Sequence, residues 1–190
     1  MEMLFEILAK ISPVPVGLRE YLEATLKRLE VRKKTILLNP GQIAKHIYFI
    51  DRGLVRGFRH DEKREQTSWL MREKDFFFSV RSFLRQMPSY EAIETLENTI
   101  LWALTYEELH YAFKTFIEFN IHRSVILENY YVLSEERHEM RTKPAFEKFK
   151  YLIDNHSELV GRVPDRYLAS YLALDKSTFS IMKTKYWKGK

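Results

Sequence analysis

Near the end of the chain, residues 164–183 have the sequence PDRYLASYLALDKSTFSIMK. Leu168 and Leu172 lie four residues apart, which places both on one face of a helix. Ala169 is small enough to let a second helix cross closely, and Asp165 stands where a carboxylate caps the first amides of a helix. This spacing predicts the first helix of a helix-turn-helix.

The second helix is expected to begin near Lys176, with Asp175 as its cap and with Phe179 and Met182 on its inner face. The usual glycine of the turn is replaced by Ala173, for which a left-handed conformation costs about 1 kcal/mol. The outward face has a size that fits the major groove of DNA. The residues predicted to contact DNA there are Lys176, Ser177, Thr178, Ser180, Ile181, Lys183 and Lys185.

The charge of the chain is concentrated at this end. Residues 144–190 hold nine basic and five acidic side chains, which accounts for +4 of the net charge of +5. From Lys176 onward there are five lysines and no acid. Such a surface attracts phosphates, although a solvated basic tail has the same composition.

The composition excludes several classes of protein. The chain has 190 residues and no cysteine, so it has no disulfide framework and no cysteine-bound zinc or iron–sulfur cluster. Its six histidines are scattered, which gives no metal site and argues against a cupin-type enzyme. No uncharged run reaches the roughly 18 residues of a membrane span, and residues 1–10 do not resemble a signal peptide. We expect a soluble, cytoplasmic protein that is not an enzyme.

Upstream, the pattern changes from helical to strand-like. Residues 3–11 and 18–29 have apolar side chains at helical spacing. The strands that follow are short and evenly spaced, which favours an antiparallel roll or barrel. The predicted strands are 35–38, 46–50, 54–58, 66–71, 75–78, 90–96 and 99–104, with a turn at 60–63.

Residues 106–143 contain neither glycine nor proline and have helical periodicity. We expect a short helix at 107–116 and a long one at 117–141, which ends before Pro144. The long helix has two apolar stripes, and the second is best explained by a partner helix in a homodimer, although both could belong to an internal core. The predicted dimer residues are Ile121, Val125, Tyr130, Val132 and Leu133.

The whole pattern resembles the Crp/Fnr family of bacterial regulators. Residues 39–56 are similar to the second and third strands of that family's roll, with Gly41 and Gly53 at its turn glycines. Residues 90–98, the long helix and residues 163–183 follow in the family's order. The resemblance implies a cyclic-nucleotide-binding-type roll, a homodimer and paired recognition helices on DNA.

Two departures limit what the resemblance implies. Lys74-Asp75-Phe76 and Ser89-Tyr90-Glu91 replace the family's phosphate-binding Gly-Glu and Arg-Ser/Thr-Ala, so cyclic AMP and cyclic GMP are not expected as ligands. The predicted pocket residues are Trp69, Phe76, Phe78, Ser89 and Tyr90, and we expect the aromatic ones to fill the cavity. On the recognition helix, Ser177 and Ile181 replace a glutamate and an arginine, so bidentate readout of guanine is lost.

These observations predict an α+β chain. It has an antiparallel β-roll (jelly-roll type) with flanking helices over 1–116, a dimerisation helix over 117–143 and a small helix-turn-helix domain over 144–190. The predicted function is a transcription regulator without a cofactor, with double-stranded DNA, a second copy of the chain, RNA polymerase and a small effector as partners. The alternative is a dimeric sensor or interaction protein of the same fold that has lost DNA or nucleotide binding.

Overall fold

A computed structural model describes residues 1–61 and 64–189 of the protein. The chain forms two compact units, Met1–Gly57 with Leu70–Glu128 and Phe58–Trp69 with Asn129–Lys190. The strands β4 (Val55–Asp61) and β5 (Arg64–Met71) and the long helix α5 (Phe119–Thr142) each contribute residues to both units. The predicted domain boundaries at 116 and 143 stay predictions.

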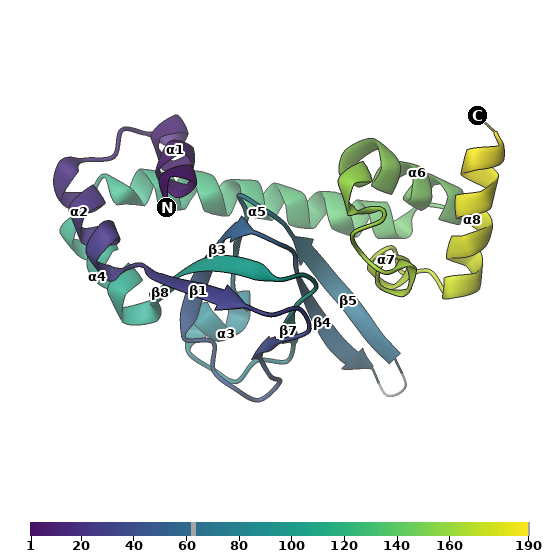
Figure 1. Ribbon diagram of the computed structural model, residues 1–190, viewed down its shortest axis with the longest axis horizontal. Helices are drawn as coiled ribbons and strands as arrows, with labels where there is room; N and C mark the ends of the chain where they lie inside the picture. Colours follow the sequence, from purple (N-terminus) through teal and green to yellow (C-terminus); the bar gives the residue numbers. More distant parts are fainter. Residues whose placement is uncertain (62–63, 190) are drawn as a thin grey trace. The chain divides into compact units, whose positions relative to one another are not determined.

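Two four-stranded sheets hold the strands, and the paired strands are antiparallel, which confirms the predicted α+β fold with an antiparallel roll. The first sheet has the order β1-β8-β3-β6 and the second β2-β7-β4-β5 (Figure 1). The remaining strands are β1 (Lys27–Val31), β2 (Ile36–Leu38), β3 (His46–Arg52), β6 (Phe76–Phe77), β7 (Ala92–Thr95) and β8 (Thr99–Thr105). Side chains of the roll, including Ile50, Leu54 and Leu101, are fully buried in the core.

The turn between β3 and β4 requires a glycine. Gly53 has a φ of 115°, and a Cβ built on it would lie 2.5 Å from the Thr99 hydroxyl oxygen. Because both the backbone conformation and the close approach exclude a side chain, the predicted turn at Gly53 is confirmed with a steric reason.

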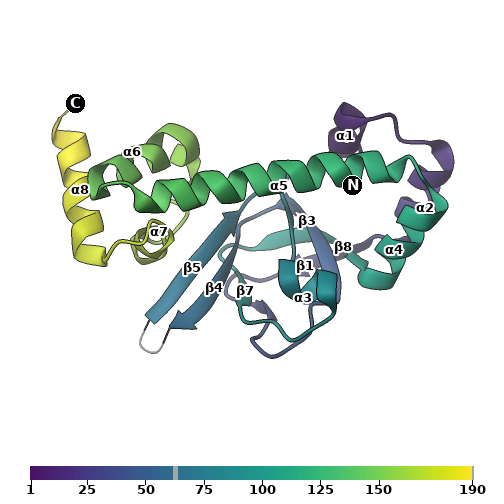
Figure 2. The same ribbon diagram turned by 180° about the vertical axis from the view of Figure 1, so that it is seen from behind.

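Helices gather at the start of α5 in the first unit (Figures 1 and 2). They are α1 (Glu2–Ile11), α2 (Val16–Thr25) and α4 (Tyr106–Thr115), and a shorter helix, α3 (Val80–Arg85), follows β6. The buried His122 of α5 fixes the end of α1, because its Nε2 lies 3.1 Å from the carbonyl oxygens of both Leu8 and Ser12. Thr105 and Glu108 form a capping box that begins α4.

The second unit contains α6 (Ala145–His156), a 3-10 turn (Ser157–Leu159), α7 (Asp165–Tyr171) and α8 (Lys176–Lys188). Its core is aromatic, with the rings of Phe149 and Phe179 5.3 Å apart. α8 packs against both α6 and α7.

Three details differ from the sequence prediction. The helix predicted at 18–29 ends at Thr25, because residues 27–31 pair with β8 and become β1. The short helix α3 was not predicted. Of the turn predicted at 60–63, residues 62 and 63 lie outside the described part of the chain.

Candidate DNA-binding surface and sensor cavities

Two helices at the C-terminal end meet at the turn that the sequence predicted. Ala173 has a φ of 52°, so its left-handed conformation is confirmed. The turn is closed by two backbone hydrogen bonds, from Ala173 N to the Ser170 carbonyl oxygen (3.1 Å) and from Leu174 N to the Ala169 carbonyl oxygen (2.9 Å). A short turn of this kind fixes the direction of α8 relative to α7.

The inner faces of α7 and α8 match the predicted packing. Leu168, Leu172 and Phe179 are buried, and so is the small Ala169. Met182, which was also expected on the inner face, is half-buried. This packing leaves the opposite side of α8 open to solvent.

Most of the predicted DNA-contact residues lie on that exposed side of α8. Lys176, Ser177, Ser180 and Lys185 are exposed, and Ile181 is 60% exposed. Thr178 is half-buried. The exposed Lys185 also lies over the Phe146 ring, with its Nζ 4.7 Å from the ring centroid.

The expected outward position of Lys183 is wrong. It follows the buried Phe179 by four residues, so the helical period turns it toward α7. There its Nζ donates to both carboxylate oxygens of Asp165, at 3.0 and 2.9 Å. Lys183 therefore joins α8 to the start of α7. The same period places Thr184, which was missed, on the exposed side, one turn after Ser180 and Ile181.

Asp175 organises the first turn of α8. Its carboxylate accepts hydrogen bonds from the backbone N–H of Thr178 (2.8 Å) and from the hydroxyls of Ser177 (2.6 Å) and Thr178 (3.0 Å). These bonds, with the Ser177 hydroxyl first, lower the pKa of Asp175 to about 2. Both hydroxyl protons are thus used within the protein, which leaves their oxygens as acceptors.

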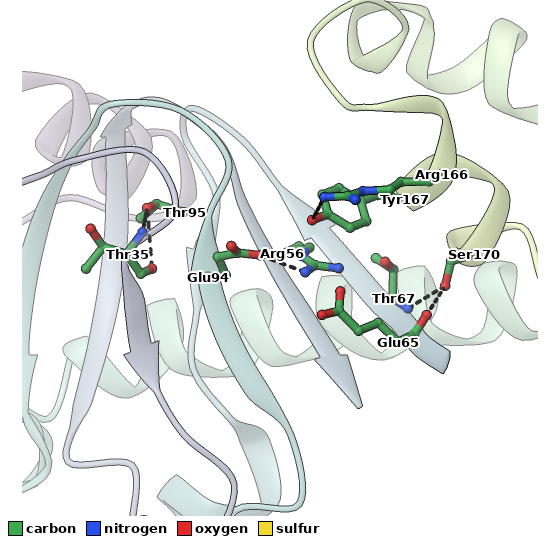
Figure 3. A network of polar contacts seen from close by, with 9 residues as sticks. All are labelled: Thr35, Arg56, Glu65, Thr67, Glu94, Thr95, Arg166, Tyr167 and Ser170. Carbon is green, nitrogen blue, oxygen red and sulfur yellow. Dashed lines mark hydrogen bonds and ion pairs between the residues drawn. The ribbon is translucent and has the colours of Figure 1, made fainter. Parts of the chain in front are cut away.

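A serine joins α7 to the edge strand of the hairpin (Figure 3). The Ser170 hydroxyl accepts from Thr67 N at 2.8 Å and donates to the Glu65 carbonyl oxygen at 2.9 Å. Arg141 of α5 adds bonds from Nη2 to the Thr67 carbonyl oxygen (2.8 Å) and from Nε to the Tyr171 carbonyl oxygen (3.1 Å). Side-chain groups thereby satisfy backbone atoms of an exposed strand edge.

A groove of about 860 Å³ lies beside this junction. Its lining includes three basic side chains, Arg64, Arg166 and Lys176, and two acidic ones, Glu65 and Asp175. The guanidinium of Arg166 stacks on the Tyr167 ring at 4.5 Å and donates to its hydroxyl at 2.7 Å. The beginning of α8 is therefore flanked by cations from α7 and β5.

In the first unit, the segment expected to hold a cyclic phosphate is closed by its own hydrogen bonds. The hydroxyls of Ser79 and Ser89 share a bond of 3.0 Å, and Ser89 also donates to the Glu91 carbonyl oxygen at 2.8 Å. Glu91 itself is buried. The fully buried Arg56 is paired with Glu94 at 2.7 Å (Figure 3). This arrangement does not suit a phosphate, because a buried carboxylate lies beside the serines and the arginine already has an anionic partner.

The residues predicted for the ligand pocket do not come together. Phe76 and Phe78 line an apolar cavity of about 90 Å³. Trp69 and Ser89 are buried, but neither lines that cavity. Tyr90 was expected to fill the pocket and is 49% exposed, so this expectation is wrong. Tyr90 lies in the turn before β7, where its side chain points away from the core while Ser89 and Glu91 point inward.

Several apolar side chains are exposed along α5. Ile121, Val132 and Leu133 from the predicted dimer interface are exposed, with Val132 at 53%. Val125 and Tyr130 are half-buried. Tyr131, which was not predicted, is also exposed. The dimer interface stays a prediction, and this face is the surface on which it depends.

Neither a metal-binding group nor a membrane-spanning helix occurs in the part of the chain that the structure describes. Among these residues, no group of three or more histidine, aspartate or glutamate side chains is placed to hold a metal ion. None of the described helices is both long enough and apolar enough to cross a bilayer.

Comparisons with known proteins agree with this geometry. Residues 28–116 match the cyclic nucleotide-binding domain family. No curated protein sequence matches the chain.

Three solved structures are similar over most of their length, each with a TM-score of 0.72. The c-di-GMP-responsive global regulator CLP of Xanthomonas campestris is 17% identical, over 92% of this chain and 93% of that one. FixK2 of Bradyrhizobium japonicum is 17% identical, over 87% and 86%. A transcriptional regulator of the Crp/Fnr family from Eubacterium rectale is 16% identical, over 92% and 84%. Residues 28–116 thus belong to the cyclic nucleotide-binding domain family, and the chain as a whole has the fold of the Crp/Fnr regulators.

Proposed function

We propose that this protein is a cytoplasmic, homodimeric transcription regulator that binds double-stranded DNA through α8. Residues 1–116 would form the sensor domain, residues 117–143 the dimerisation helix and residues 144–190 the DNA-binding domain. The similar structures support this proposal at the level of the fold, because the solved proteins include transcription regulators.

The observation that carries the proposal is the α7–turn–α8 geometry. The left-handed Ala173 and the buried Phe179 hold α8 with one side against the domain and the other side in solvent. A helix presented in this way fits the major groove, while residues at its ends contact phosphates. A fold with no role in DNA binding has no need for an exposed second helix of this polarity.

The charges around α8 support phosphate contact. Lys176, Lys185 and Lys188 are exposed on the helix, and Arg166 is exposed on the preceding one. Phosphate contacts by such cations give affinity that falls with salt and depends little on sequence. The readout of bases would then rest on Ser180, Thr184 and the methyl groups of Ile181, which suit a thymine methyl.

Dimerisation follows from the exposed apolar side chains of α5. Ile121 and Val132 lie eleven residues apart, which returns them to the same side of a helix. A second copy of α5 would cover both. Two-fold pairing would also present two copies of α8 to two half-sites on DNA.

The second candidate is a sensor or interaction protein that no longer binds DNA. The specific observation in its favour is that Asp175 holds the hydroxyls of Ser177 and Thr178, while Asp165 holds Lys183. These bonds remove one cation and two donors from the predicted surface. An anionic Asp175 would also repel a nearby phosphate.

The test is a selection of bound genomic fragments by the purified full chain, with and without an extract of small metabolites. We expect enrichment of a two-fold symmetric sequence, and loss of that enrichment in Lys176→Ala. The matched control is Lys10→Ala, which removes an exposed lysine from α1. Recovery of fragments at the frequency of the input library would favour the second candidate.

A further inference from the structure

The first unit holds an apolar cavity that is separate from the phosphate-binding segment. It lies between strands β3, β6 and β8 and the helices α1, α2, α4 and α5. Trp102 and Leu104 of β8 line it, while the alternate residues Leu101 and Ala103 do not. Because side chains alternate along a strand, the cavity is on the helix-covered side of this sheet, opposite the interior of the roll.

Two polar groups break the apolar lining. The indole nitrogen Nε1 of Trp102 is buried and has no hydrogen-bond partner among the residues that the structure describes. The described lining includes one charged side chain, Arg123 of α5, whose guanidinium lies 5.0 Å from the centre of the Phe113 ring. Arg123 is exposed, so it stands where the cavity meets solvent.

The chemistry of these two groups defines what can bind. An indole N–H and a guanidinium only donate hydrogen bonds, so a ligand must bring acceptors. A buried N–H without a partner is unfavourable, and an acceptor on a ligand would remove that penalty. An anionic acceptor is favoured over a neutral one, because Arg123 supplies the opposite charge that a partly buried anion requires.

The size of the cavity limits the rest of the ligand. Its volume is about 90 Å³. This is less than the roughly 150 Å³ of a dry apolar cavity that admits benzene, so a short chain of about four to six carbons fits better than a fused ring. Polar additions to the chain would face Leu22, Phe49 and Leu109, which offer no hydrogen bonds.

We propose that this cavity binds a short-chain aliphatic monocarboxylate, with the carboxylate accepting from Trp102 Nε1 and paired with Arg123, and with the chain among the apolar side chains. Ile126 and Leu127 of α5 belong to the lining, next to Val125 of the predicted dimer face. A bound carboxylate would therefore contact α5 directly. The proposal does not depend on DNA binding.

The experiment uses the full-length protein labelled with ¹⁵N and hexanoate as the probe. The chain has three tryptophans, so its spectrum shows three indole N–H signals, and the Trp102 signal is the one that Trp102→Phe removes. We expect hexanoate to shift this signal and to leave that of Trp187, on α8, unchanged. Calorimetry should show at least about tenfold weaker hexanoate binding to Trp102→Phe and to Arg123→Gln.

Hexan-1-ol and hexylamine serve as matched ligands. Hexan-1-ol should bind more weakly than hexanoate and equally to the parent and to Arg123→Gln, while hexylamine should not bind. Because Arg123 is exposed, Arg123→Gln is expected to fold even if Trp102→Phe does not. The proposal is overturned if the Trp102 signal does not move, or if hexan-1-ol binds as tightly as hexanoate and Arg123→Gln changes neither, which would leave only an apolar packing defect.

Discussion

Replacing Ala173 by glycine should stabilise the C-terminal unit, because the turn between α7 and α8 holds this residue in a left-handed conformation with a φ of 52°. That conformation costs a non-glycine residue about 1–2 kcal/mol. Glycine loses about 0.4–1 kcal/mol more than alanine in backbone entropy on folding. Ala173 is exposed, so removing its methyl group removes little packing. The net expectation for Ala173→Gly, from these two opposing effects, is a gain of about 0.5–1 kcal/mol.

The assay is urea unfolding of the full chain followed by far-ultraviolet circular dichroism, with the midpoint and slope measured separately. Gly161→Ala is the matched control, since Gly161 has a φ of 94° and open space around its Cα, so alanine there should destabilise through the backbone alone. Ala169→Gly, inside α7, should also destabilise. The reasoning is refuted if Ala173→Gly lowers the free energy of unfolding, or if Gly161→Ala is neutral.

Three further predictions concern the core, the dimer and the cap of α8. Arg56→Met should cost about 3–5 kcal/mol in chemical denaturation, because it leaves the buried Glu94 carboxylate without its cation, and adding Glu94→Leu should recover most of this loss; a fully additive double variant would contradict it. Val132→Glu should convert a dimer into a monomer in sedimentation, whereas Glu118→Gln, an exposed change near the start of α5, should leave the dimer intact; an unmutated monomer at micromolar concentration would remove the basis of this prediction. Asp175 has a pKa lowered to about 2, so its support for α8 is present above about pH 4 and is lost as the pH falls from about 4 to 2. Asp175→Asn should therefore weaken the acid dependence of the helical signal in that window, and an identical acid titration for both proteins would count against it.

The sequence predicted the elements whose signals are local. Short apolar runs between turn glycines such as Gly53 indicated the roll. The spacing of Leu168, Leu172 and Phe179 indicated the two C-terminal helices, and the left-handed turn at Ala173 followed from its position in that motif. In each case the periodicity of the chain and the chemistry of the turn lead to the same structure.

What the sequence could not predict depends on partners distant in the chain. Residues 27–31 continue an apolar helical pattern, but pairing with β8, about seventy residues later, makes them a strand. Lys183 was placed outward because its partner Asp165 lies on another helix, although its spacing from Phe179 was a usable signal. The cavity at Trp102 is built from five helices and three strands, so no local pattern could indicate it.

The central claim is that α8 and its lysines bind DNA, and a fluorescence-anisotropy titration over a salt series tests it most directly. The account predicts binding at low salt to both a selected and a random duplex, with a preference for the selected one. Lys185→Ala or Lys188→Ala should weaken both alike and reduce the salt slope by about one for each phosphate that the lysine no longer neutralises, while Lys10→Ala changes neither. Absence of binding to either duplex at low salt, or an equal loss of affinity in Lys10→Ala, would contradict the account.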